Sequence, residues 1–212
     1  MAGWRSSAAL CLVAAAVVGI LAGCNLYSPP FTFNNVYDPN RDTTSTIALR
    51  TIAVDGNSGD WGDTLPMMID SQGDWDNLYG SGQAIDISAV YLAKDSTYLY
   101  WRIDLWDGPA SSAANYGLNI WQGIENSTES ITVSHGAGGV YAALEHTDGT
   151  GLWLGDPIPD ALAAIGSSFE GRVPLASFGN FVSPRAHFYA TYSDVALGQD
   201  SYDDGGVIEL SL

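Results

Sequence analysis

The stretch from Asp86 to Asp107 is DISAVYLAKDSTYLYWRIDLWD, and it contains two segments that favour β-strands. Ile87–Ala93 and Thr97–Trp106 are rich in β-branched and aromatic residues, which suit a pleated, half-buried surface. The polar sequence Lys94-Asp95-Ser96 between them is typical of a turn. The stretch therefore predicts a β-hairpin at the centre of the fold.

The second of these segments has two distinct faces, because successive side chains of a strand point to opposite sides. One face is apolar and predicts a stripe directed at the core, formed by Leu99, Trp101, Ile103 and Leu105. The other face is amphipathic and is expected to meet solvent or a ligand; it consists of Tyr98, Tyr100, Arg102, Asp104 and Trp106.

Most of the remaining chain consists of short strand-like segments that are separated by turn-forming residues. Further strands are predicted at Thr46–Val54, Pro66–Asp70, Asn115–Gln122, Ser130–Ser134, Val140–His146, Leu152–Leu154, Ser167–Val173, Ala186–Val195 and Val207–Leu212. Ile158–Ile165 is expected to form one or two helical turns. Short strands without a long helical period favour an all-β, antiparallel β-sandwich, jelly-roll-like, as a single domain over residues 46–212.

The first 23 residues resemble a bacterial lipoprotein signal peptide. Ala8–Ala22 is apolar but too short, with the wrong flanks, for a transmembrane helix. It ends in Leu21-Ala22-Gly23-Cys24, which resembles a lipobox, so Cys24 is the predicted lipidation site and residues 24–45 the predicted tether. The alternative is an ordinary secretory signal with Cys24 merely nearby.

The cysteines and the residue after Cys24 agree with a lipid anchor. Cys11 is the only other cysteine and would be lost with the signal, so the exported domain has no disulfide and no thiol ligand. Asn25 differs from the aspartate that retains lipoproteins in the inner membrane. These features predict a lipid-anchored protein of the cell envelope, on the outer membrane or the cell surface, without a membrane-spanning segment.

The charge balance is strongly acidic. The chain has 7 Lys and Arg against 24 Asp and Glu, and removal of Arg5 with the signal gives 6 − 24 = −18. Nucleic acid and anionic lipid need a basic footprint, so both are disfavoured as partners, whereas cations are favoured. The alternative is that the acidity keeps an exported protein soluble.

Aspartates are concentrated among glycines before the central hairpin: Asp55, Asp60, Asp63, Asp70, Asp74, Asp76 and Asp86. Calcium takes about 6–8 oxygen ligands, which acidic, glycine-rich loops can supply. We therefore predict a structural calcium ion with Asp70, Asp74 and Asp86 as ligands, and Asp60 next. The alternative is turn chemistry, in which aspartates accept hydrogen bonds from nearby backbone amides.

Four segments occur in an order that resembles a known family. They are Ile52-Ala53-Val54-Asp55-Gly56 with Asp60-Trp61, DSTYLY at 95–100, FEGRVPL at 169–175 and GVIEL at 206–210. Over residues 46–212 they resemble family-nine carbohydrate-binding modules and the wider DOMON-like β-sandwiches. The resemblance implies a domain that binds rather than catalyses, with sugar or haem as ligand and often a structural calcium ion. The chain departs from the family at Asn115–Gln122, which has no carboxylate where the family has an acidic run.

Sugar recognition needs flat aromatic faces together with polar groups that contact hydroxyls. The predicted carbohydrate-contacting residues are Tyr100, Arg102, Trp106, Trp121 and Trp153. The alternative is that these side chains pack between sheets, as we predict for Trp61 and Trp101. Haem would need axial ligands such as Met67 or Met68 with His187, and a histidine in an aromatic strand is more often packed or exposed than a ligand.

Catalysis has little support in the sequence. The three histidines fall in different segments, and neither a nucleophile elbow nor an H-E-x-x-H motif is present. The sequence therefore predicts a surface-anchored, non-catalytic binding domain with glycan or polysaccharide as partner and a structural calcium ion. The alternative is a structural or protein-interaction domain of the cell envelope with no small ligand.

Overall fold

A computed structural model describes residues 46–212, except 76–83, 123–128, 149, 180 and 195–198. The side chains at 153, 194, 199 and 200 are also outside the description. All described residues belong to one compact unit, Val36–Leu212. The predicted signal peptide, the lipidation site Cys24 and the predicted tether lie outside the described residues.

The first sheet has six strands and contains the predicted hairpin. Across the sheet the order is β1 (Ala48–Leu49), β3 (Ile87–Lys94), β4 (Tyr98–Leu105), β10 (Phe169–Pro174) and β9 (Leu162–Ile165), with β2 (Met68–Ile69) also paired to β3. The β1–β3 pair is parallel and the other pairs are antiparallel. The central hairpin β3–β4 confirms the prediction, and each of its four strand ends agrees with the predicted end within one residue.

The second sheet also has six strands, all antiparallel. Its order is β12 (Gln199–Glu209), β11 (Pro184–Asp194), β5 (Asn115–Gln122), β6 (Glu129–Gly136), β7 (Gly139–Thr147) and β8 (Trp153–Pro157). The described helical structure is limited to two short 3-10 turns, η2 (Ser58–Trp61) and η3 (Leu175–Phe178). No helix in the described part of the chain is both long and apolar enough to cross a membrane.

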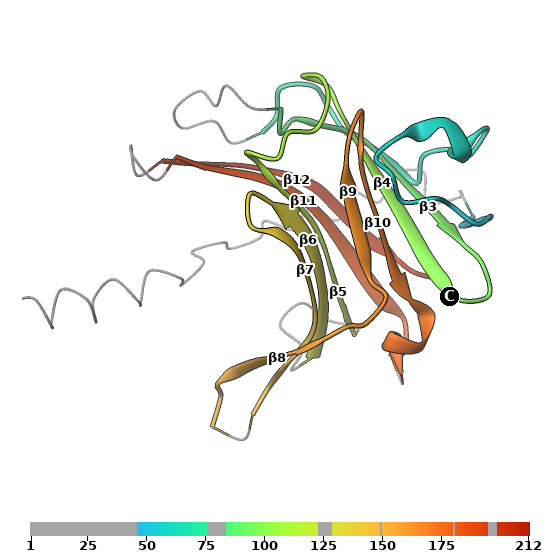
Figure 1. The fold of residues 1–212 in the computed structure, drawn as a ribbon, viewed down its shortest axis with the longest axis vertical. Coiled ribbons are helices and arrows are strands. Elements are labelled where there is room, and N and C mark those ends of the chain that lie inside the picture. Colours follow the sequence, from blue (N-terminus) through green and yellow to red (C-terminus); the bar gives the residue numbers. More distant parts are fainter. Residues whose placement is uncertain (1–45, 76–83, 123–128, 149, 180, 195–198) are drawn as a thin grey trace, which may run out of the picture. The chain divides into compact units, whose positions relative to one another are not determined.

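The main core lies between the two sheets, which confirms the all-β sandwich (Figure 1). Leu99, Trp101 and Ile103 of β4 are fully buried there, as the alternation predicts. The second sheet contributes apolar side chains from its own alternating positions, among them Leu118 and Phe188. Removal of this apolar surface from water is the main favourable term in folding.

A second, smaller cluster covers the outer face of the first sheet. It consists of Ile52, Trp61, Ala93 and Tyr100, and the blue-green segment that carries η2 runs over this face in Figure 1. Residues 50–54 therefore do not continue the strand predicted at Thr46–Val54, of which only β1 pairs in the sheet. Trp61 and Trp101 are both core residues, as predicted, but they belong to different clusters.

Two further predicted elements differ from the structure. The helical prediction for Ile158–Ile165 is wrong, because Leu162–Ile165 forms β9 and pairs with β10. The last strand begins at Gln199 rather than at Val207, since the long β11–β12 hairpin extends through a sequence rich in Asp and Gly. Its register shifts between Phe188 and Tyr189, opposite the extra residue Gly205. Such a bulge changes which side chains face the core.

Candidate metal centre

Three aspartates meet where the first sheet approaches β12. Asp70 follows β2, Asp74 lies in the turn after it, and Asp203 lies on β12 of the second sheet. Each offers one carboxylate oxygen, and these three oxygens all lie within 4.8 Å of one another. Asp70 and Asp203 are buried, whereas Asp74 is exposed. The cluster is thus anchored in both sheets and open on one side.

Hydrogen bonds hold the members of the cluster in place. The Ile87 amide at the start of β3 donates to Asp203 Oδ2 over 2.5 Å, which joins the second sheet to the first. The Asp204 amide donates to the other oxygen of Asp203, Oδ1, over 2.8 Å. The Ser71 amide donates to Asp70 Oδ1 over 3.1 Å.

A fourth carboxylate, Asp86, lies beside this cluster. It immediately precedes β3 and is almost completely buried. The Gly73 amide donates to its Oδ2 over 2.9 Å, so its carboxyl group faces the turn that carries Asp74. Its other oxygen, Oδ1, is buried and has no hydrogen-bond partner in the described part of the chain. A buried carboxylate oxygen without a donor is costly, and a cation is one group that would stabilise it.

Burial also perturbs the protonation of these groups. It raises the pKa of Asp203 to about 7, and the negative charges of Asp70 and Asp74 act in the same direction. Burial likewise raises the pKa of Asp86, with further contributions from the charges of Asp107 and Asp74. Neither Asp86 nor Asp203 forms an ion pair with a described lysine or arginine. Asp70, Asp74, Asp86 and Asp203 thus place several negative charges close together, and all of them except Asp74 are buried.

The donor set fits a hard divalent cation. It contains only carboxylate oxygens, with no histidine or cysteine, which favours calcium or magnesium over zinc or copper. Oxygens within 4.8 Å of one another are compatible with one cation at about 2.3–2.6 Å from each, the distance calcium prefers. Three carboxylates supply three to six of the roughly 6–8 oxygens that calcium takes, and the exposed side leaves room for water.

The sequence identified part of this centre. It placed Asp70, Asp74 and Asp86 in one acidic region, and the structure brings the first two together with the third beside them. Asp60 is not part of the cluster, because its Oδ2 accepts a hydrogen bond from the Ala53 amide over 2.6 Å in the segment before η2. Asp203 was missed, although it lies in the sequence QDSYDDGG, which is as acidic and glycine-bearing as the predicted loops.

The predicted carbohydrate face on β4 is covered at two positions. Tyr100 is buried in the outer cluster, and its hydroxyl donates to Asp95 Oδ2 over 2.7 Å. Arg102 is buried as well, and its guanidinium lies over the rings of Tyr91 and Trp61, at 3.7 and 5.4 Å from their centroids. The expectation that these two side chains meet solvent or a ligand is wrong, because residues 50–64 pack over them.

The predicted tryptophans have different surroundings. Trp121 is only 7% exposed and lies beside His187, with 5.9 Å between the ring centroids. Trp153 lies on β8, but its side chain is outside the description. Trp106 is 45% exposed at the end of β4. Its indole Nε1 donates to the backbone oxygen of Asp70 over 3.2 Å, which places it directly beside the carboxylate cluster.

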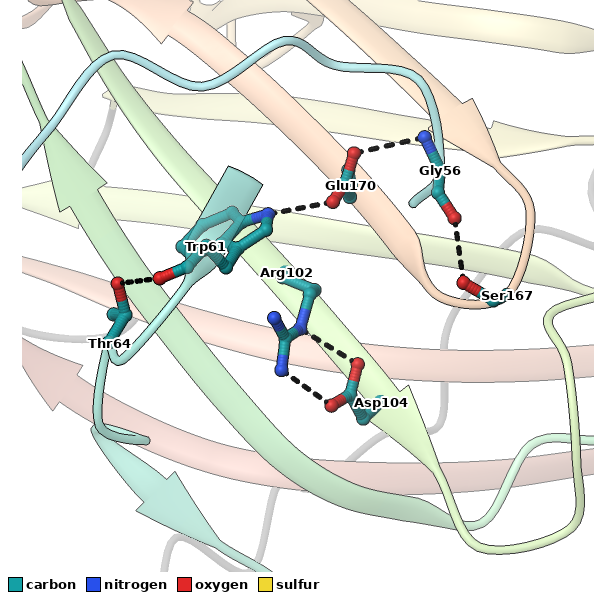
Figure 2. A network of polar contacts seen from close by, with 7 residues as sticks. All are labelled: Gly56, Trp61, Thr64, Arg102, Asp104, Ser167 and Glu170. Carbon is teal, nitrogen blue, oxygen red and sulfur yellow. Dashed lines mark hydrogen bonds and ion pairs between the residues drawn. The ribbon is translucent and has the colours of Figure 1, made fainter. Parts of the chain in front are cut away.

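Glu170, a fully buried carboxylate on β10, holds Gly56 of the D-G segment and Trp61 of the D-W segment (Figure 2). Trp61 Nε1 donates to its Oε1 over 2.7 Å, and the Gly56 amide donates to its Oε2 over 2.9 Å. Arg102, on the neighbouring strand, instead forms a bidentate pair with Asp104, at 2.9 and 2.8 Å. This arrangement gives the D-G and D-W segments a structural role in closing the outer cluster.

A second polar group lies on the outer side of the second sheet. His187 Nε2 is 2.7 Å from Asp204 Oδ1, and the Tyr202 hydroxyl is 3.3 Å from the same nitrogen. Although burial opposes ionisation, the contact with His187 lowers the pKa of Asp204. Met68 packs in the core between the sheets with Ala186 and Phe188 of β11, whereas His187 alternates with these two residues and lies on the outer side of the second sheet. The geometry gives no support to a haem bound between them.

Comparisons with protein-family models, with curated proteins and with solved structures found no match. The resemblance to family-nine carbohydrate-binding modules and DOMON-like domains therefore stays a prediction from the sequence.

Proposed function

We propose that this chain is a non-catalytic carbohydrate-binding β-sandwich that is stabilised by a calcium ion. The observation that carries the proposal is the carboxylate cluster of Asp70, Asp74 and Asp203, which comes from three separated segments and includes two buried members. A cation there would join the first sheet to β12 and offset the repulsion among the three charges. Surface attachment through Cys24 belongs to the same proposal and rests on the lipobox-like sequence.

The carbohydrate part of the proposal rests on the sequence resemblance and on Trp106. An exposed indole beside carboxylates combines an apolar ring face with acceptors for hydroxyl groups, which is the chemistry that a saccharide requires. The non-catalytic part rests on the sequence, which contains no catalytic motif.

Thermal unfolding of the purified chain tests the calcium part. A ligand that binds only the native state at about 100 times its Kd stabilises it by about 2.7 kcal/mol. For a chain of this length this corresponds to a rise in Tm of roughly 5–11 °C. We expect calcium, added after chelation, to raise Tm by this order, and magnesium to raise it less because it demands a stricter octahedral geometry.

Two variants make the test specific. Asp203→Asn removes one ligand charge and should abolish the response to calcium. Asp63→Asn is the matched control, since the Asp63 side chain is 98% exposed and pairs with Arg50, away from the cluster, so this variant should respond like the wild type. Coincident unfolding curves with chelator and with calcium would contradict the calcium part.

Affinity electrophoresis in gels that contain neutral polysaccharides tests the carbohydrate part, and unretarded migration in all of them would contradict it.

The alternative, a protein-interaction domain with no small ligand, is favoured by one specific observation. β8 is an edge strand of the second sheet, and Leu152 and Leu154 at its start are exposed. Apolar side chains on an unpaired strand edge favour contacts with another protein. Pull-down against envelope proteins with Leu154→Lys as the matched variant distinguishes this function, because Leu154 is not among the residues that are predicted to contact carbohydrate.

A further inference from the structure

We infer that the metal centre positions Trp106, so that saccharide binding by this domain depends on the bound cation. This inference rests on the proposed function and deepens it. It names Trp106 as the side chain that contacts the saccharide and the bound cation as the condition for that contact. The ligand class is a neutral saccharide, which presents C–H groups to the indole face and hydroxyls to the neighbouring carboxylates.

Trp106 is attached to the metal centre at two points. Its indole Nε1 donates to the backbone oxygen of Asp70 over 3.2 Å, and its own amide donates to the backbone oxygen of Asp86 over 2.8 Å. Asp70 is a member of the carboxylate cluster, and Asp86 lies beside it. The position and the orientation of the indole are therefore both set by the backbone of residues that a cation would order.

Four of the predicted carbohydrate-contacting side chains are described by the structure, and among these four Trp106 is the one that solvent can reach. It is 45% exposed, whereas Tyr100, Arg102 and Trp121 are buried. Its surroundings are acidic, since Asp107 follows it in the chain and Asp74 is exposed in the adjacent turn. Carboxylates accept hydrogen bonds from hydroxyls but repel anionic groups, so the site favours a neutral sugar over an acidic one.

Beside the cluster lies a buried group that itself points to a ligand, the Asp86 carboxylate. Oδ1 of Asp86 is buried and has no hydrogen-bond partner in the described part of the chain, while Oδ2 is fixed to the Gly73 amide. Without a cation, the cluster combines this group with three mutually repelling carboxylates, and the turn at residues 70–74 is destabilised. The carbonyl that holds the indole belongs to this turn, so loss of the cation removes the pre-organisation on which ligand affinity depends.

Isothermal titration with a panel of neutral gluco-, xylo-, manno- and galacto-oligosaccharides tests the inference. We expect an oligosaccharide to bind in calcium and to bind at least about tenfold more weakly in chelator, a difference of about 1.4 kcal/mol. Trp106→Ala should abolish this binding yet keep the calcium-dependent rise in Tm. Tyr141→Ala is the matched control, because Tyr141 is 47% exposed on β7 of the other sheet and should not contribute.

Trp106→Phe provides a second variant, since it keeps an aromatic face but cannot donate to Asp70. We expect it to bind the oligosaccharide between about three- and tenfold more weakly than the wild type. Equal affinity in calcium and chelator, or wild-type affinity of Trp106→Ala, would overturn the inference and leave the proposed function standing. Binding of none of the oligosaccharides in either condition would overturn the carbohydrate part of the proposed function and the inference with it.

Discussion

Glu170 is a single buried carboxylate that fixes a loop far from it in the sequence. It accepts hydrogen bonds from Trp61 Nε1, from the Gly56 amide and, over 3.1 Å, from the Asp55 amide. Burial raises the pKa of its carboxyl group, while these three donors act in the opposite direction. Since all three are N–H donors, the carboxylate form, which only accepts, suits the site best.

Glu170→Gln should therefore be destabilising although it conserves shape. The amide retains one acceptor oxygen and turns a donor toward at least one N–H group, which leaves a buried donor unsatisfied. The loss of hydrogen bonds to a charged group corresponds to about 1.5–3 kcal/mol in the free energy of unfolding. Urea unfolding measures it, with the exposed Glu209→Gln as control. Equal unfolding midpoints for the two variants would show that the network does not stabilise the fold.

Asp203 predicts an unusual dependence of stability on pH. Its folded-state pKa of about 7 lies above the value of about 3.9 for an unfolded aspartate, so the folded state binds the proton more tightly. Its contribution to stability is therefore present below about pH 4 and is lost as the pH rises through 7. In chelator, Tm should rise when the pH is lowered from about 8 to about 5.

The same pH series on Asp203→Asn isolates the effect, because the amide does not titrate. Asp95 does not interfere in this window. Burial opposes the ionisation of Asp95, but the hydrogen bonds from Tyr100 and from two backbone amides outweigh burial and lower the pKa of Asp95 to about 2. A wild-type protein whose Tm does not change over the window, or a variant that keeps the change, would contradict the assignment to Asp203.

At the level of strands, the pairing of β4 with β10 depends on one glycine. Gly171 lies opposite Trp101 in the register, and a Cβ atom at Gly171 would overlap Cζ2 of the Trp101 ring. The indole is fully buried between the sheets and lies against the backbone of the neighbouring strand. Glycine at this position, with no Cβ atom, therefore leaves the room that the Trp101 ring occupies.

Gly171→Ala should lower the stability by about 1–3 kcal/mol through overpacking. This change corresponds to a fall in Tm of roughly 2–12 °C for a chain of this length. Gly138→Ala in the turn between β6 and β7 is the control, because a Cβ atom there has nothing within 4 Å. Differential scanning calorimetry of the two variants checks the result, and an unchanged Tm for Gly171→Ala would mean that Trp101 can move aside without loss.

The strands show what local sequence predicts and what it does not. All ends of β3, β4 and β5 agree with the predicted ends within one residue, because alternation and turn residues mark these strands locally. The stretch that forms β9 gave no such signal, since its short apolar and alanine-rich sequence suits a helical turn as well as an edge strand. The start of β12 was missed because Asp and Gly there favour loops, and pairing with β11 outweighs this local preference.

At the level of the whole molecule, the cluster of Asp70, Asp74 and Asp203 depends on contacts that no local pattern encodes. The hydrogen bond from Ile87 to Asp203 joins residues 116 positions apart, and it exists only because β12 lies against β3. The sequence could therefore group Asp70, Asp74 and Asp86, which are near one another in the chain, but not Asp203. Likewise, alternation placed Tyr100 and Arg102 correctly on one face of β4, but only the fold shows that residues 50–64 cover that face.

Because the net charge is −17, calcium could raise Tm either by occupying a specific site or by screening the repulsion among surface charges. The dependence of Tm on salt concentration separates these two effects. Self-repulsion destabilises a compact acidic chain, and salt weakens it because the Debye length falls to about 10 Å at 0.1 M. In chelator, we therefore expect Tm to rise when sodium chloride is increased from about 20 to about 300 mM. The buried carboxylates of Asp70 and Asp203 are screened much less than surface charges. If calcium binds there as we propose, the additional rise in Tm on calcium addition should persist at the higher salt concentration. Loss of that rise at about 300 mM salt would mean that calcium acts only as a screening ion on an acidic surface.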